Sequence, residues 1–304
     1  MAKTQLLRLP DDRRFEIIRA GRGDDVLLVH PGGPGLSSPY LSNLLALAGP
    51  RRQVVLLHPR GVGRSYRPRS PRSYTVRAMA DDVEAVRHAL GGRPVDLLGF
   101  SAGGFVAIEY AHRHPGGLRS LLLCGTAASA ADLRTANRRI LAGATPSQRR
   151  ALRALEKRRA FSTPEYQSLI EEIERPYQSR YLRSPAHALA SSQMNFDVYR
   201  AMMTRSGNEF VVDGTLARWD GRPSLARVRV PSLVLVGRDD FLYPASKEIA
   251  RRIPGARFVT LARASHLANL ERPREYRAVL RRFLEDVGSG ALTPRRPGRR
   301  RAPR

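Results

Sequence analysis

The sequence has a single cysteine, Cys124, and no apolar run long enough to cross a bilayer. One cysteine excludes a disulfide within the chain, and its place after the apolar residues 121–123 predicts a small core residue in a reducing compartment. A membrane-spanning helix needs about 20 apolar residues. Residues 1–15 also lack the apolar stretch and cleavage site of a secretory signal. We therefore expect a cytoplasmic protein with no membrane partner.

Metal-binding motifs are missing as well. The chain contains no His-Glu-x-x-His, Cys-x-x-Cys or EF-hand spacing. We therefore predict no metal site and no cofactor, so side chains and backbone groups should supply the chemistry.

Lysine is rare although the chain is strongly basic. The formal net charge is +26, yet only Lys3, Lys157 and Lys247 are lysines among the 53 basic residues. The arginines are spread over the whole length, and no RNP, KH or zinc-finger pattern accompanies them. Such a spread is typical of the codon usage of a GC-rich genome. The charge favours loose, salt-sensitive binding to polyanions, but we predict no specific nucleic-acid partner.

Strand and helix patterns alternate over the first 125 residues. Strands are expected at 5–9, 14–19, 26–30, 54–58, 95–98 and 118–124, and helices at 40–48, 75–90 and 105–112. The first two strands flank Pro10-Asp11-Asp12 and predict a hairpin. The later alternation predicts βαβ crossovers, and therefore an α/β fold with a mostly parallel central sheet flanked by helices.

The pattern changes after the sixth predicted strand. Residues 127–206 are rich in Arg, Ala, Glu and Gln at helical spacing, and Pro146, Pro164, Pro176 and Pro185 divide them into four or five short helices. Strand patterns return at 232–236 and 257–261, each followed by a helix pattern, at 245–252 and 272–287. We predict one α/β core at 1–126 and 216–287, interrupted by a helical cap at 127–215.

The C-terminal residues 288–304 form a separate segment. From residue 291 onward they contain six arginines, three prolines and no acid. We expect a disordered tail, because like-charged runs are usually solvated. A polyanion-binding arm is the alternative.

The most informative segment is 95–104, VDLLGFSAGG. A buried strand leads into Gly99-Phe100-Ser101-Ala102-Gly103, and a helix follows, which is the strand–turn–helix context of the G-x-S-x-G nucleophile elbow. The turn holds Ser101 on a strained backbone, and the glycines on either side let strand and helix approach. A Gly-rich connection that merely contains serine is the simpler alternative.

A nucleophilic serine needs a base, and the base needs a group that orients it. In doubly wound hydrolases the three residues follow in the order Ser, acid, His, each after a strand. The strand at 232–236 leads into Gly237-Arg238-Asp239-Asp240, and the strand at 257–261 leads into a loop with His266. Asp239 or Asp240 could be the acid, and we favour Asp240 because Pro244 follows at the fourth position. Four other histidines follow no suitable strand: His88, His112, His114 and His187. His88 and His187 lie in helix patterns, where we expect them on solvated faces.

Acyl transfer also needs donors for the developing oxyanion. The loop Gly32-Gly33-Pro34-Gly35 follows the strand that ends at His30. We assign the two donors to the backbone amides of Gly33 and Ala102. A plain turn is the alternative reading of the glycine-rich loop.

Together these motifs resemble enzymes of the α/β-hydrolase fold, and the order matches over about residues 13–287: HPGGPG at 30–35, HPRGVGRS at 58–65, GFSAGG at 99–104, GRDDFLYP at 237–244 and SHLANLERP at 265–273. With the segment YRAMMTRSGNEFVVDGTLARWD at 199–220, the chain is similar to the proline iminopeptidase family, which includes the tricorn-interacting aminopeptidase.

The resemblance implies that Glu209, in the Asn-Glu-Phe segment, binds the free α-amino group of a peptide substrate, and we add Gly32 and Phe241 to the substrate-binding residues. A surface glutamate or a brace to an arginine is the alternative. Phe241 replaces an acidic residue that often serves the family as a second amine anchor. Ala102 replaces a common aromatic residue after the nucleophile, and His58 replaces an aspartate.

The sequence therefore predicts a serine hydrolase that cleaves N-terminal residues, proline among them, from short peptides or amino-acid amides. Ser101 attacks, His266 acts as base and then acid, and Asp240 orients the imidazole. A carboxylesterase, lactonase or specialised amidase with the same residues is the nearest alternative. A non-catalytic ligand-binding protein and an arginine-rich nucleic-acid binder are the others.

Overall fold

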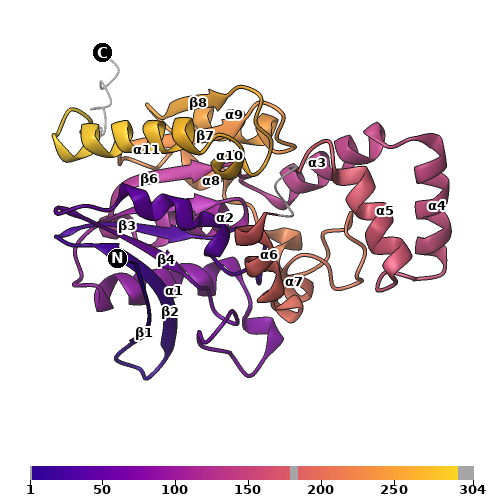
Figure 1. Cartoon of the computed structure of the whole chain (residues 1–304), viewed down its shortest axis with the longest axis horizontal. Coiled ribbons are helices and arrows are strands. Elements are labelled where there is room, and N and C mark those ends of the chain that lie inside the picture. Colours follow the sequence, from indigo (N-terminus) through magenta and orange to yellow (C-terminus); the bar gives the residue numbers. More distant parts are fainter. Residues whose placement is uncertain (1, 179–183, 294–304) are drawn as a thin grey trace, which may run out of the picture.

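A central eight-stranded sheet organises the chain in the computed structural model, which describes residues 2–178 and 184–293 (Figure 1). The strand order is β1-β2-β4-β3-β5-β6-β7-β8. The strands are β1 (Lys3–Arg8), β2 (Arg14–Gly21), β3 (Asp25–His30), β4 (Arg52–Leu57), β5 (Val95–Phe100), β6 (Leu118–Cys124), β7 (Ser232–Gly237) and β8 (Arg257–Leu261).

The pairing pattern confirms a mostly parallel sheet. β1 and β2 form the expected antiparallel hairpin, and β2 runs antiparallel to β4. Every later pairing is parallel. The carboxyl ends of β3, β5, β7 and β8 therefore meet at one edge, where open α/β sheets place their sites.

Helices cover both faces of the sheet. On one face the core includes side chains from α1 (Val76–Ala89), α2 (Ala102–Arg113), α8 (Arg222–Leu225) and α9 (Tyr243–Arg252). On the other it includes side chains from the 3-10 helix η1 (Pro39–Leu47), α10 (Ala268–Glu271) and α11 (Pro273–Gly288). Leu97 and Leu98, neighbours on β5, belong to opposite cores because successive strand residues alternate.

The helical insertion follows β6, as predicted. It comprises α3 (Ala130–Gly143), α4 (Pro146–Lys157), α5 (Pro164–Glu174), α6 (Pro185–Ser192) and α7 (Phe196–Met202). Pro146, Pro164 and Pro185 each begin a helix, because proline fits the first turn but not the interior. Figure 1 shows α3, α4 and α5 projecting beyond the sheet. These three helices share a small core of their own that includes Leu152, Tyr166 and Ile170.

Two expectations about local structure need correction. The helix expected at 40–48 is a 3-10 helix over Pro39–Leu47, and no side chain caps its N-terminus. The helix expected at 105–112 begins earlier, at Ala102, because it starts directly at the turn.

Cys124 is buried as predicted. No helix among the described residues is long and apolar enough to span a membrane. Most of the predicted disordered tail, 294–304, lies outside the described residues.

Candidate active site

Ser101 lies in the turn between β5 and α2, in a backbone conformation that L-residues rarely adopt. Its φ is 51° and its ψ is −121°. The turn is tight because a Cβ on Gly99 would lie 2.4 Å from the carbonyl oxygen of Gly103. Strain of this kind costs on the order of 1–3 kcal/mol and persists only where the surrounding structure enforces it. Here it directs the serine side chain into a pocket above the sheet.

The structure brings Ser101, His266 and Asp240 together. The Ser101 Oγ–His266 Nε2 distance is 3.0 Å, and His266 Nδ1 lies 3.1 and 3.0 Å from the two carboxylate oxygens of Asp240. Because a carboxylate can only accept, Nδ1 carries the proton and Nε2 is left to accept from the serine hydroxyl. Asp240 is buried and also accepts from the N–H of Leu242 at 2.8 Å. The geometry suits a proton relay away from the serine.

The neighbouring aspartate and the other weighed histidines lie elsewhere, with one exception. Asp239 is exposed, and its N–H donates to the carbonyl of Ala264 at 2.9 Å, so it stabilises the turn. His187 was expected on a solvated helix face, and this expectation is wrong. It lines the same pocket as Ser101 and packs against Tyr40, with ring centroids 6.0 Å apart. The helical pattern of α6 did not reveal that its face is turned toward the core.

The predicted oxyanion donors flank the nucleophile. Gly33 and Ala102 both line the pocket, and within the described part of the chain neither backbone N–H has a hydrogen-bond acceptor. Gly32 lies behind Ser101 rather than on the pocket wall, and its N–H donates to the Tyr40 hydroxyl at 2.6 Å. A Cβ on Gly32 would lie 2.6 Å from Cβ of Ser101, so only glycine lets this loop approach the elbow.

The pocket is small and mostly apolar. Its volume is about 210 Å³, below the roughly 300–1,000 Å³ typical of ligand pockets. Phe241 forms part of the wall and packs on the imidazole of His266, with the two ring centroids 4.7 Å apart. Phe105, Leu133 and Ile140 add apolar surface. The pocket therefore has room for a small, mostly apolar group.

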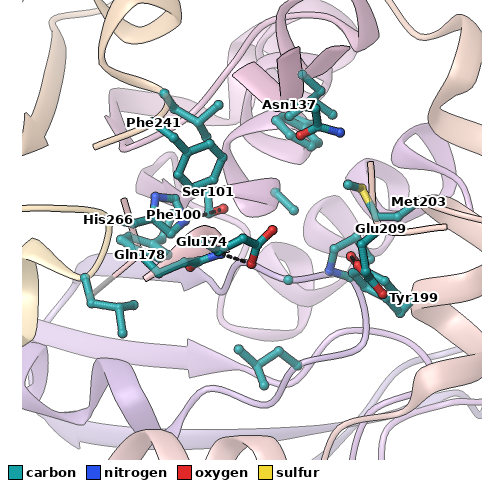
Figure 2. Close-up of a pocket in the computed structure, with 18 of the residues that line it drawn as sticks. Phe100, Ser101, Asn137, Glu174, Gln178, Tyr199, Met203, Glu209, Phe241 and His266 are labelled. Carbon is teal, nitrogen blue, oxygen red and sulfur yellow. Dashed lines mark hydrogen bonds between the residues drawn. The ribbon is translucent and has the colours of Figure 1, made fainter. Parts of the chain in front are cut away.

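Glu209 reaches the pocket from the loop after α7, and no arginine braces it among the described residues. Its carboxylate accepts a hydrogen bond from the Tyr199 hydroxyl, and its backbone N–H donates to the hydroxyl of Tyr166 at 3.1 Å. Burial raises the pKa of Glu209. The carboxylate thus lies in a partly desolvated wall opposite the nucleophile (Figure 2).

Sequence reasoning missed a second carboxylate, Glu174, which ends α5 and lines the same pocket. A signal was present, because Glu174 follows the buried Tyr166 and Ile170 by eight and four residues and so shares their helix face. The adjacent acidic pair Glu171 and Glu172 concealed it by making the segment look like a solvated face. No group of His, Cys, Asp and Glu among the described residues could hold a metal ion.

Comparison with known proteins agrees with this architecture. The model of the alpha/beta hydrolase fold family matches residues 25–273, and the chain belongs to that family. It is accordingly a hydrolase.

Among individual relatives, the chain is 29% identical to the proline iminopeptidase of Thermoplasma volcanium over 89% of this chain and 92% of the relative. Among solved structures, the proline iminopeptidase of Mycobacterium smegmatis superposes on this chain with a TM-score of 0.85 and 30% sequence identity. The match covers 95% of this chain and 100% of that one. VinJ is 27% identical, with a TM-score of 0.84, over 94% and 99%.

Proposed function

We propose that the protein is a serine aminopeptidase that releases small N-terminal residues, including proline, from short peptides or amino-acid amides. One observation carries the proposal: the hydrogen-bonded chain Ser101–His266–Asp240 shares one small pocket with the partly buried carboxylate of Glu209. An aminopeptidase needs this combination, because it must hold an ammonium about one residue away from the scissile carbonyl.

The proposed reaction proceeds through an acyl-enzyme. His266 Nε2 takes the proton of Ser101 as Oγ attacks the carbonyl, and the oxyanion is held by the N–H groups of Gly33 and Ala102. The imidazolium then gives its proton to the leaving amine. As the bond from carbonyl carbon to nitrogen breaks and the amine leaves, the acyl group stays on Ser101. Water then attacks the acyl carbonyl while His266 takes its proton, and the bond to Ser101 Oγ breaks as that proton returns to the serine, which frees the acid product. Asp240 keeps the imidazole oriented and stabilises its charged form.

Similar proteins and the shape of the pocket both support the peptidase assignment. The proline iminopeptidases of Thermoplasma volcanium and Saccharolobus solfataricus match about nine-tenths of the chain, at 29% and 27% identity. The pocket wall of Phe105, Leu133 and Ile140 would receive a small apolar side chain. Residues of α3 and α5 also line the pocket, so the helical insertion would limit the substrate's length.

A carboxylesterase, lactonase or amidase is the second candidate, favoured by Phe241. Where the family resemblance implies a second acidic residue, this aromatic ring packs on the histidine and carries no charge. An ester or lactone needs the same acyl transfer and no amine anchor.

A substrate panel separates the two candidates. Prolyl, alanyl and leucyl anilides should be cleaved, their N-acetylated forms should not, and Glu209→Gln should remove most of this selectivity. Equal turnover of acetylated amides or simple aryl esters would instead establish the esterase or amidase. Labelling of Ser101 by a fluorophosphonate checks that the protein is catalytic at all, since a ligand-binding protein would stay unlabelled.

A further inference from the structure

Phe241 separates the active-site pocket from a second cavity. The pocket, of about 210 Å³, holds Ser101 and His266, and the second cavity, of about 160 Å³, lies between α3 and α9. Among the described residues, Phe241 alone lines both. One half-buried aromatic ring is therefore the wall between the nucleophile's pocket and this second cavity, which we call the side groove.

The side groove is built from two helices that meet beside Phe241. α3 supplies Thr135 and Ala136, and α9 supplies Pro244 and Ala245. Thr135 and Pro244 are exposed, so the groove opens to solvent, whereas Ala136 is buried. The remaining side chains that line it are charged: Asp132, Arg139 and Glu248. Because alanines on both helices contribute little bulk, the groove has room for a flat or extended group.

Contacts on several sides hold the Phe241 ring in place. Its centroid lies 4.7 Å from that of His266. The side chain also packs against the core that includes α1, α2, α8 and α9, and against the separate core of α3, α4 and α5. Since the ring is fixed between the sheet and the helical insertion, the pocket and the side groove are kept apart.

The leaving group of an acyl transfer at Ser101 must lie close to Phe241. His266 Nε2 lies 3.0 Å from Ser101 Oγ, and general-acid catalysis requires the same nitrogen to reach the departing atom. Phe241 packs on this imidazole. In the view of Figure 2, Phe241 and His266 lie on one side of Ser101, and Glu209 lies on the other. The side groove therefore lies behind the wall that faces the leaving group rather than the acyl group.

The cavity volumes indicate what this wall does. The active-site pocket alone is smaller than the roughly 300–1,000 Å³ of ordinary ligand pockets, whereas the pocket joined to the side groove would enter that range. We infer that Phe241 is a specificity-determining residue that closes a leaving-group channel between α3 and α9. The protein then accepts only substrates with a compact leaving group, such as amino-acid amides and dipeptides. The inference rests on the proposed acyl transfer at Ser101, which the aminopeptidase and esterase candidates share.

The test varies the leaving group while the acyl group stays constant. Prolyl anilide is compared with prolyl 4-phenylanilide, and phenyl acetate with 4-phenylphenyl acetate. The second phenyl ring enlarges the leaving group and changes its acidity little, so the ratio of kcat/KM, bulky over compact, reports how well it fits. This ratio should be low in the unaltered protein, and Phe241→Ala should raise it about tenfold or more. A weaker contact with His266 would affect both members of a pair equally and cancel in the ratio.

Further variants locate the effect. Phe241→Tyr keeps the ring and should keep the ratio low. Ala245→Trp added to Phe241→Ala refills the side groove and should lower the ratio again. Lys247→Ala, at an exposed residue of α9 that does not line the groove, is the matched control. If Phe241→Ala does not fold, Phe241→Val removes less of the side chain and should raise the ratio by a smaller factor.

An unchanged ratio in Phe241→Ala, a rise that Ala245→Trp does not reverse, or a high ratio already in the unaltered protein would overturn the inference. So would a gain for phenyl hexanoate over phenyl acetate in Phe241→Ala, since the wall would then face the acyl group. If only the ester pair is cleaved, the aminopeptidase proposal fails, and the ratio within that pair still decides the role of Phe241. Cleavage of neither pair would refute both.

Discussion

The backbone carbonyl of Gln178 accepts a hydrogen bond from the N–H of His266 at 3.0 Å. The same carbonyl accepts a second bond from the Ser265 hydroxyl at 2.7 Å, and the Gln178 side chain donates to Glu174. The end of α5 is therefore fixed to the histidine loop of the core. One short segment therefore contacts the histidine loop and holds the pocket carboxylate of Glu174.

Loss of the Ser265 hydroxyl should loosen this junction. Ser265→Ala removes one of the two bonds to Gln178 and a bond to Glu271. A net loss of about 1 kcal/mol of stability is expected for such a bond, with kcat/KM reduced about three- to tenfold because the histidine loop moves more freely. Kinetics on prolyl anilide and urea unfolding measure both. Ser289→Ala is the control, because Ser289 is exposed and directly follows α11. Equal kinetics and stability of the two variants would refute the link between Ser265 and the histidine loop.

Two substitutions at Ser101 should separate catalysis from backbone strain. Ser101→Ala and Ser101→Gly should both lower turnover at least about 10³-fold, because each removes the nucleophile. Only glycine relieves the positive φ of 51°, so Ser101→Gly should unfold with a free energy about 1 kcal/mol higher than Ser101→Ala. Urea unfolding of the two variants checks this difference. Identical stabilities would show that the turn is unstrained.

The two adjacent aspartates offer a matched pair. Asp240→Asn should lower kcat by about 10⁴-fold with little change in KM, because the amide favours the wrong histidine tautomer. Asp239→Asn should leave kcat within about twofold, since that side chain is exposed and the imidazole is hydrogen-bonded to Asp240 instead. Steady-state kinetics on one anilide substrate measures both. A large effect at Asp239 and none at Asp240 would exchange their roles.

The stability of the protein should depend on the protonation of Glu174. Burial, followed by the nearby charge of Glu209, raises its pKa from 4.5 to about 7, whereas Gln178 and His266 act in the opposite direction. Tyr199 also lines this part of the pocket. A raised pKa in the folded state contributes stability that is fully present below pH 4.5 and is lost as the pH rises through about 7.

Glu174→Gln should therefore be more stable than the unaltered protein at pH 8, by on the order of 2 kcal/mol, and the difference should shrink toward pH 4.5. Urea unfolding at several pH values between these limits tests the sign and the window. Glu172→Gln, on the exposed side of α5, should show no such trend. A Glu174→Gln variant that is less stable at pH 8 would contradict the burial cost.

Much of the architecture could be predicted because it depends on local chemistry. The strands carry apolar residues with period two or in buried runs, and the elbow combines glycines with a strand and a helix around Ser101. Thr75, the first residue of the helix expected at 75–90, caps α1, and its hydroxyl accepts from the N–H of Ala78 at 3.1 Å. The parallel topology then requires the acid and the histidine to follow consecutive strands, which predicts His266 and one of the adjacent Asp239 and Asp240.

Only the tertiary structure decided what faces the pocket from the helical insertion. Short amphipathic helices expose both a core-facing and a solvent-facing side, and their sequences do not say against which element each side packs. Thus Glu174 and His187 line the cavity although both lie in polar segments. The packing of Phe241 on His266 is likewise visible only in the folded chain. The sequence alone determines features that depend on neighbouring residues, such as the elbow at Ser101 and the helix caps. Contacts between elements that are distant in the sequence depend on how the whole chain packs.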